Sequence, residues 1–298
     1  MIILMLTLLG LCFGSFVNAL VWRLHKQEEE QTVGSRQLVA KKAKKSTKLS
    51  ANSYPLIAKD LSILKGRSMC VHCKHVLAWY DLFPVISWIS LLGKCRYCHK
   101  PISCQYPIVE LATAFLFVFS YLFWPSILHS PFSILQFCMW LVFLVGFMAL
   151  IVYDLRWMLL PDRIVKPLQL LAGIYVLNQA IMLGGGWSSL LGAAIGVLCS
   201  AGLFYLLYQI SDGRWIGGGD VKLAVVLGLI LGGPLNILLM IFIASSIGSI
   251  LAIPLIILGK ARQNTRIPFG PLLIVATCIV YLFGAVLAEW YKKQFLLF

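Results

Sequence analysis

The sequence predicts an all-α polytopic membrane protein with about eight transmembrane helices and a cysteine-bearing loop after the first of them. Three observations predict this class. The 298-residue chain is 60% hydrophobic and only 12% charged, whereas soluble domains carry about 25% charged residues. Its apolar runs recur at the length of roughly 20 residues that a helix needs to cross a bilayer. Four of its nine cysteines form two Cys-x2-Cys pairs within one polar stretch.

The apolar runs give the order of the spans. They lie at about 1–22, 107–125, 132–153, 164–184, 188–211, 221–232, 235–258 and 269–288. The sixth run is short for a complete crossing and extends into glycine-rich flanks. The first run has the length of a signal peptide, but it lacks a leading basic region and an obvious small-residue cleavage site before Arg23, so we expect a retained span.

The runs divide the chain into three parts. Residues 1–22 are the first span, 23–106 a basic loop and 107–298 a transmembrane bundle. Between Arg23 and Lys100 the loop has 15 Lys or Arg residues against five acidic ones. Such an excess is typical of cytoplasmic loops, which places the N-terminus outside.

The short connections agree with this topology. The inner connections at 154–163, 212–220 and 259–268 contain Lys or Arg, whereas the outer turns at 126–131, 185–187 and 233–234 contain neither. We expect the basic loop to meet anionic headgroups of the lipid bilayer and not nucleic acid, because few aromatic residues interleave the lysines of 41–48. Residues 26–66 are polar and Lys-rich, and we expect much of that stretch to be mobile.

The cysteine pairs predict a metal site in this loop. Cys70 and Cys73 form one pair, and Cys95 and Cys98 form the other after 21 intervening residues. Two such pairs suit a tetrahedral four-thiolate zinc site, and a closed site of this kind folds the loop and performs no chemistry. Four incidental cysteines are the alternative, and disulfides are disfavoured in a reducing cytoplasm.

Two aspartates mark the inner ends of spans. Asp154 closes the third apolar run, and Asp220 directly follows Gly217, Gly218 and Gly219. A carboxylate at a bilayer margin is costly and usually serves a function. Two nearby carboxyls share one proton, so one activates water as a base while its partner donates to a carbonyl oxygen, as in aspartic proteases. We expect the glycines to adopt unusual dihedrals and to let a substrate backbone approach.

Each of these residues also has a structural alternative. Asp220 is then an N-cap of the sixth span, and Asp154 is a surface partner of Arg156. Asp162 is expected to support the site or to cap the fourth span. Lys222 is expected either to pair with Asp220 or to contact substrate.

Several motifs occur together in one order along nearly the whole chain. They are GSFVNALVWRL at 14–24, WYD at 79–81, PVISW at 84–88, the two cysteine pairs, VEL at 109–111, the segment 154–162, GGGD at 217–220 and IPFGP at 267–271. In this combination the chain resembles the bacterial type IV prepilin peptidases, GxGD-type intramembrane aspartic proteases that are also called leader peptidase/N-methyltransferases.

The resemblance implies two activities. Asp154 and Asp220 match the aspartates that cleave the leader of prepilins and pseudopilins at the cytoplasmic face of the bacterial inner membrane. The zinc-bearing loop accompanies methylation of the new N-terminal amine, with S-adenosylmethionine as donor. Gly93 matches a glycine that the family associates with methylation, and Glu110 is a second candidate for binding the donor.

Two alternatives use the same features differently. A transporter or channel with a zinc-stabilised cytoplasmic loop also employs intramembrane aspartates and glycine breaks, but these aspartates lie at one face and not at the midplane. A methyltransferase that uses its bundle only as an anchor has no soluble nucleotide-binding pattern here to support it.

Overall fold

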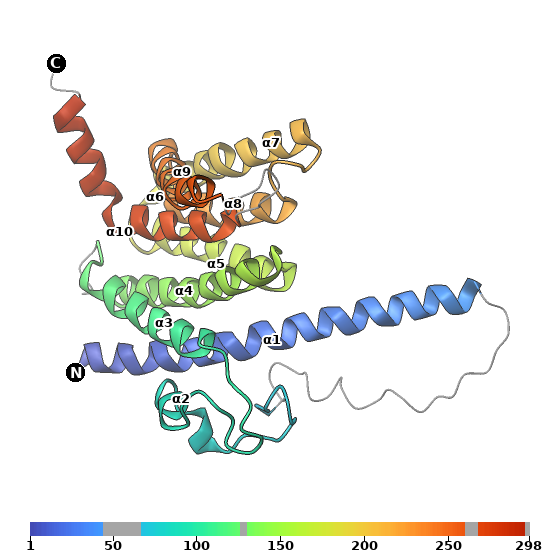
Figure 1. Cartoon of the computed structure of the whole chain (residues 1–298). Helices are drawn as coiled ribbons and strands as arrows, with labels where there is room; N and C mark the ends of the chain where they lie inside the picture. The colour runs from blue at the N-terminus through green and yellow to red at the C-terminus, as the bar shows by residue number, and fades with distance from the viewer. Residues whose placement is uncertain (44–66, 126–129, 260–267, 296–298) are drawn as a thin grey trace. The chain divides into compact units, whose positions relative to one another are not determined.

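The computed structural model of the chain describes residues 1–43, 67–125, 130–259 and 268–295. Within these ranges every regular element is a helix (Figure 1). Extended pairing in them is limited to two isolated bridges, Met69 with Val76 and Lys94 with Pro101. The predicted all-α class is therefore confirmed.

The chain divides into two compact units, Met1–Leu116 and Phe117–Phe298. The first unit contains α1 (Ile2–Ala43), the short helices η1 (Trp79–Leu82) and α2 (Ile86–Ser90), and most of α3 (Gln105–Leu122). The second unit contains the end of α3 and then α4 (Pro131–Trp157), α5 (Asp162–Ile181), α6 (Gly186–Val197), η2 (Leu198–Gly202), α7 (Leu203–Ser211), α8 (Gly218–Leu231), α9 (Pro234–Ile257) and α10 (Phe269–Phe295).

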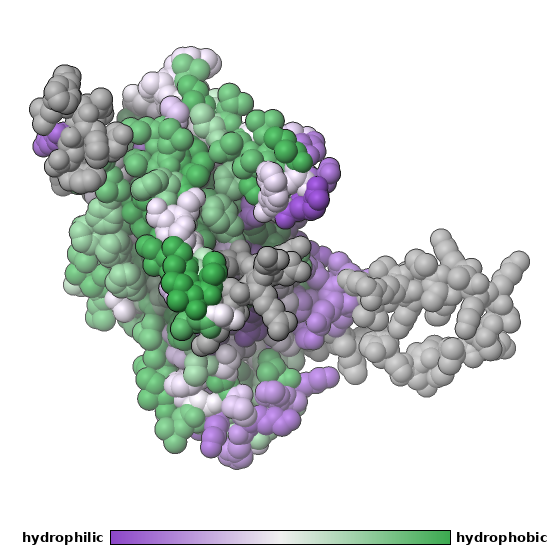
Figure 2. Space-filling model, turned by 45° about the horizontal axis from the view of Figure 1, so that its top comes forward, coloured by the Kyte–Doolittle hydropathy of each residue, from purple (hydrophilic) through white to green (hydrophobic). Residues whose placement is uncertain are grey.

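Seven helical segments of the described chain are long and apolar enough to cross a membrane, which makes this a multi-pass membrane protein. They are Ile2–Gln31, Gln105–Leu122, Pro131–Trp157, Asp162–Ile181, Gly186–Ser211, Pro234–Pro254 and Phe269–Leu287. Hydrophobic residues cover much of the visible surface (Figure 2). The predicted sixth run, 221–232, corresponds to α8, and the 14 residues of this helix span only about 21 Å, less than the bilayer core of about 30 Å.

The first helix is longer than the sequence predicts. We expected the span to give way to a loop after residue 22 and much of 26–66 to be mobile, but α1 continues without a break to Ala43. Residues 26–31 are strong helix formers, and Glu29 pairs with His25 and Lys26 one turn earlier. The rest of that stretch, 44–66, lies outside the described residues, as do 126–129 and 260–267 from two predicted connections.

The short helix α8 lies at the centre of the second unit. It contacts α5, α6, η2 and α10, and Leu223, Ala224, Val226 and Leu227 are fully buried. The predicted continuous span at 188–211 contains a π-helical turn, η2, where it crosses α8. There Ser200 Oγ donates to Ala224 O at 2.9 Å, and a Cβ atom on Gly228 would lie 2.4 Å from Ser200 Oγ. Small residues therefore let the two helices touch and fix the position of α8.

Candidate active site

Asp154 lies in the last turn of α4. The helix ends when Met158 adopts the left-handed conformation, and the Met158 amide donates to Asp154 O at 2.8 Å. The Asp154 side chain is buried, with only 6% of the residue exposed. Arg156 stacks over the Trp157 ring and forms no ion pair with Asp154. The alternative of a surface pair between Asp154 and Arg156 is therefore wrong.

Asp220 is the third residue of α8 and is half-buried. The N-cap position belongs to Gly217, so Asp220 is not the N-cap of the helix. Its carboxylate instead accepts a hydrogen bond from the backbone amide of Gly217. An acidic side chain in the first turn of a helix is also stabilised by the positive end of the helix dipole.

The two carboxyls meet at Gly270, the second residue of α10. The Gly270 amide donates to the Asp154 carboxylate. A Cβ atom on Gly270 would lie 2.7 Å from Asp154 Oδ2 and 3.6 Å from Asp220 Oδ1, so the two oxygens are no farther apart than these distances added together. A single water that lies about 2.8 Å from each oxygen can bridge two oxygens within this limit.

Gly270 is the residue of this site that the sequence argument missed. First-turn amides of a helix have no acceptor within the helix, so the Gly270 N–H is free to donate to Asp154. Gly270 is buried, and any side chain there would enter the space between the carboxyls. The motif IPFGP at 267–271 indicated that this helix start has a special role. Only the folded chain shows that the role of Gly270 is to leave room for two carboxyls.

Among the glycines before Asp220, Gly219 is required because it has no side chain, and not because of an unusual backbone conformation. None of Gly217, Gly218 and Gly219 has a positive φ, so that part of the prediction is wrong. A Cβ atom on Gly219 would lie 2.9 Å from Leu160 Cβ. Gly219 therefore lets the start of α8 pack against the chain segment that follows Asp154.

Asp162 and Lys222 form an ion pair beside the two carboxyls and link α5 to α8. Lys222 Nζ lies 2.6 Å from Asp162 Oδ1, and Lys166 Nζ lies 3.5 Å from Asp162 Oδ2. The N-cap of α5 is Pro161, so Asp162 does not cap the helix. Residues two apart on a helix do not face each other, which explains why Lys222 pairs with Asp162 and not with Asp220.

The four cysteines of the first unit form a cluster of the size that a zinc ion requires. The Sγ atoms of Cys70, Cys73, Cys95 and Cys98 all lie within 4.8 Å of one another, and Cys70 Sγ is 3.8 Å from Cys98 Sγ. A tetrahedral site with Zn–S bonds of about 2.3 Å has sulfur–sulfur edges of about 3.8 Å. The residues present therefore fit a four-thiolate metal site.

The two cysteine pairs are built by the same turn. Cys70 N donates to His75 O and Lys74 N to Cys70 O; Cys95 N donates to Lys100 O and His99 N to Cys95 O, all at 2.9 Å. Lys74 and His99 occupy the left-handed region at the matching positions. Burial raises the pKa of the Cys70 thiol, but hydrogen bonds from the amides of Cys73 and His72 outweigh it and set the pKa at about 7, which favours the thiolate that a metal binds.

Gly93 lies in the turn that leads into the second cysteine pair. Its φ of +68° belongs to the left-handed region, and a Cβ atom there would lie 2.9 Å from the Trp88 ring. Gly93 O also accepts from Ile102 N at 2.7 Å. These contacts give Gly93 a clear role in packing, and a role for it in binding a methyl donor stays a prediction.

Glu110 is buried between α1, α3 and the start of α2. Its Oε2 accepts from the Val85 amide at 2.7 Å, and the Ser15 side chain also donates to it. Its residue is only 5% exposed. These partners occupy the carboxylate from within the protein, and donor binding by Glu110 likewise stays a prediction.

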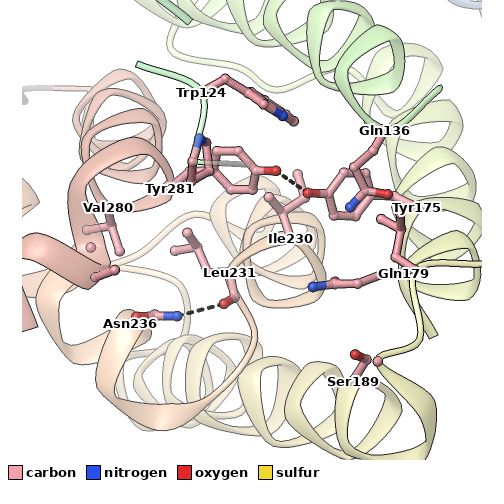
Figure 3. A pocket seen from close by; sticks show the side chains of 15 residues that line it. Trp124, Gln136, Tyr175, Gln179, Ser189, Ile230, Leu231, Asn236, Val280 and Tyr281 are labelled. Carbon is pink, nitrogen blue, oxygen red and sulfur yellow. Dashed lines mark hydrogen bonds between the residues drawn. The ribbon is translucent and has the colours of Figure 1, made fainter. Parts of the chain in front are cut away.

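A separate cavity of about 520 Å³ lies at the other end of the second unit (Figure 3). Its polar lining is uncharged and includes Gln136, Tyr175, Asn236 and Tyr281, with a hydrogen bond between the two tyrosine hydroxyls. Gln136 precedes Asp154 by 18 residues of the same helix, which is about 27 Å. This cavity therefore lies far from the two carboxyls and offers no acid–base pair.

Comparison with known proteins gives consistent matches over the chain. Residues 8–124 match the bacterial peptidase A24 N-terminal domain, and residues 141–253 match the type IV leader peptidase family. Proteins named prepilin leader peptidase/N-methyltransferase are similar to it: that of Aeromonas hydrophila is 32% identical over 97% of this chain and 93% of its own length. The Pseudomonas aeruginosa protein is 32% identical over 96% of this chain and 92% of its own length. The Bacillus subtilis protein is 31% identical over 78% of this chain and 88% of its own length. Among solved structures, none is significantly similar.

Proposed function

The chain belongs to the type IV leader peptidase family, and from that premise we propose that it removes the leader peptide of type IV prepilins or pseudopilins and methylates the new N-terminal residue. Asp154 and Asp220 are the catalytic residues of this proposal. The observation that carries it is the convergence of both carboxyls on Gly270, at the start of α10.

Peptide hydrolysis by this pair needs one shared proton and one water. Two carboxyls this close do not both ionise cheaply. The ionised carboxylate takes a proton from the water as the water oxygen attacks the scissile carbonyl carbon, and the protonated partner donates to the carbonyl oxygen. The C–N bond then breaks, and the leaving amine takes the proton that came from the water. The amide of Gly270 holds the Asp154 carboxylate, and the amide of Gly217 holds the Asp220 carboxylate. Asp162 and Lys222 support the site by holding the start of α8 against α5.

The expected location of this chemistry is the cytoplasmic margin of the bacterial inner membrane. Asp154 ends a spanning helix and Asp220 begins a short one, so both lie where a substrate helix leaves lipid. Arg156 lies in the last turn of α4, Arg163 in the first turn of α5 and Arg214 in the connection between α7 and α8, whereas the described turns at 182–185 and 232–233 contain no Lys or Arg. Positive charge of this kind stays on the cytoplasmic side.

We assign zinc to Cys70, Cys73, Cys95 and Cys98, because the sulfur cluster has the dimensions of a zinc tetrahedron. Bound there, the ion supplies no chemistry and cross-links the two turns of the loop. S-adenosylmethionine is the methyl donor of the proposal, and the first unit, which contains the loop, is where Gly93 and Glu110 are placed as donor-binding candidates.

The test uses the full chain in nanodiscs with a purified prepilin and isotopically labelled S-adenosylmethionine. The mass of the mature N-terminus reports both cleavage and methyl transfer in one spectrum. Wild type is expected to yield a shortened, methylated product, and the Asp154→Asn and Asp220→Asn variants are expected to yield neither. Normal leader removal by either variant would refute the assignment of the two aspartates.

A further inference from the structure

Within the first unit, α1 and α3 pack against each other in a register that can be followed residue by residue. A Cβ atom on Gly10 would lie 2.4 Å from Ala114 Cα, and one on Gly14 would lie 2.5 Å from Glu110 Cα. One turn further, Asn18 Nδ2 donates to Tyr106 O at 3.2 Å. Every step of four residues forward on α1 is a step of four backward on α3, so the helices are antiparallel and in close contact.

This register gives the depth of Glu110 in the membrane. Glu110 follows the first residue of the α3 span by five positions, which is about 7.5 Å along the helix. On α1 it faces Gly14, which lies well inside the apolar run of residues 1–22. The Glu110 carboxylate is therefore placed below the level at which the two spans enter the membrane.

The loop helix α2 is tied to this depth. Val85, its N-cap, donates its amide to Glu110 Oε2 at 2.7 Å. Val85 has a φ of +60°, a conformation that β-branched residues rarely adopt. The buried carboxylate thus holds a strained entry to α2 in place, and the segment that follows begins beside the spanning helices and not beyond their ends.

Four large hydrophobic side chains of this segment are exposed. Phe83, Ile86, Ile89 and Leu92 recur at every third position, and they are 48%, 68%, 59% and 83% exposed. Four large exposed hydrophobic side chains within ten residues mark an interaction surface. We call these four residues the α2 face.

Most backbone amides of the segment are paired, as suits backbone groups in lipid. Apart from Val85, whose partner is Glu110, acceptors within the segment serve the amides of Ile86, Ser87, Ile89, Leu91, Leu92, Gly93 and Lys94. The Ser90 hydroxyl donates to Ser87 O, and the Trp88 indole donates to Ile102 O.

Basic residues accompany the α2 face along the chain. In residues 67–104 there are five Lys or Arg, and Asp81 is the only acidic residue. Asp81 is itself paired with Arg96. An apolar face next to net positive charge matches a membrane with anionic headgroups.

We propose that the α2 face is immersed in the cytoplasmic leaflet, with Phe83, Ile86, Ile89 and Leu92 among the acyl chains and the four-cysteine cluster at headgroup level. The occupant of this surface is lipid and not a second protein. The proposal needs the membrane spans and their register, and it is independent of the peptidase assignment. It makes the zinc-bearing loop a part of the protein that is attached to the membrane surface.

The test places a photo-crosslinking residue, p-benzoylphenylalanine, at Ile86 or Leu92 of the full chain in nanodiscs of phosphatidylcholine and phosphatidylglycerol. The matched control is His99, an exposed polar position in the second cysteine turn. After irradiation, mass spectrometry is expected to find at least about fivefold more acyl-chain adduct at 86 and 92 than at 99. Zinc content equal to wild type shows that each variant is folded.

Three results would overturn the proposal. One is equal lipid labelling at 86 and 99; another is crosslinking of 86 or 92 to peptides of Phe117–Phe298; the third is crosslinking to a second copy of the chain. A companion measurement uses Ile86→Lys with Ile89→Lys. Amide hydrogen exchange over 84–94 in nanodiscs is expected to rise about tenfold relative to wild type, and unchanged protection would also contradict immersion.

Discussion

Gly270→Ala tests the active-site geometry more directly than removal of either carboxyl. The added Cβ would lie 2.7 Å from Asp154 Oδ2, closer than real Cβ atoms come to other atoms, and 3.6 Å from Asp220 Oδ1, which is ordinary contact. The new methyl group therefore presses on one carboxyl and leaves the other in place. Because the Asp154 oxygen is the end of a short side chain, it can move aside without disturbing the fold.

The size of the effect follows from the distance. Restoring ordinary contact moves the Asp154 oxygen by roughly 0.7 Å, and a misplacement near 1 Å at a reacting group costs about 10²-fold in rate. We expect kcat for leader cleavage to fall about 10- to 100-fold, or about 1.4–2.7 kcal/mol in activation free energy. KM is expected to change little, because the substrate surface is untouched.

The assay measures kcat and KM for release of the leader from a purified prepilin by the full chain in nanodiscs. Gly173→Ala is the matched control: Gly173 lies within α5, and a Cβ atom there would meet nothing within 4 Å. It is expected to keep wild-type kcat. If Gly270→Ala also kept wild-type kcat while Asp154→Asn was inactive, the convergence on Gly270 would not be the catalytic geometry.

Three further predictions concern the carboxyls, the ion pair and the cysteine cluster. Asp154→Asn and Asp220→Asn are each expected to lower kcat by at least about 10²-fold, and the double variant to be no slower than the worse single one because the pair acts as a unit; additive losses in the same cleavage assay would argue against a dyad. Asp162→Asn and Lys222→Met are expected to keep cleavage within a few-fold, since ion pairs open to water contribute little; a loss as large as that of Asp154→Asn would make Asp162 catalytic. Cys98→Ser, or treatment with a chelator, is expected to remove zinc, to raise amide exchange over 69–101 and to abolish methylation. Leader cleavage is expected to persist, because both carboxyls lie in the second unit. Loss of cleavage in the zinc-free protein would contradict that separation.

Much of this molecule could be predicted from its sequence, because membrane spans and metal-binding cysteine pairs are local patterns. Apolar length predicts a span, and the spacing of Cys70, Cys73, Cys95 and Cys98 predicts their cluster, which the structure confirms. The extension of α1 to Ala43 was not predicted, since a polar helix carries no apolar period to reveal it. The polar composition of 26–66 predicted a mobile segment, but the helix propensity of its first residues continues α1 instead.

The residues that the sequence misassigned all depend on packing between distant segments. Gly219 was expected to provide unusual dihedrals, yet it provides room for Leu160. Lys222 was expected to pair with Asp220 or to contact substrate; the first alternative is wrong, because the rotation of α8 directs its ammonium group to Asp162. Gly270 was recognised only as part of a motif, because its contact with Asp154 joins residues more than a hundred positions apart. Such contacts are a property of the fold and have no local signal.

The positions of the two carboxyls also explain how a membrane bundle tolerates them. Helix starts are the places where backbone amides lack partners within the helix and where the helix dipole is positive. The Asp154 carboxylate takes its hydrogen bond from the start of α10, and the Asp220 carboxylate takes its own from the start of α8. The free amides and the carboxyl oxygens thus satisfy each other, whereas neither would find a partner in lipid. Because α8 is too short to cross the membrane, its start is held by the Ser200–Ala224 contact and the Asp162–Lys222 pair, and these contacts determine where Asp220 meets Asp154.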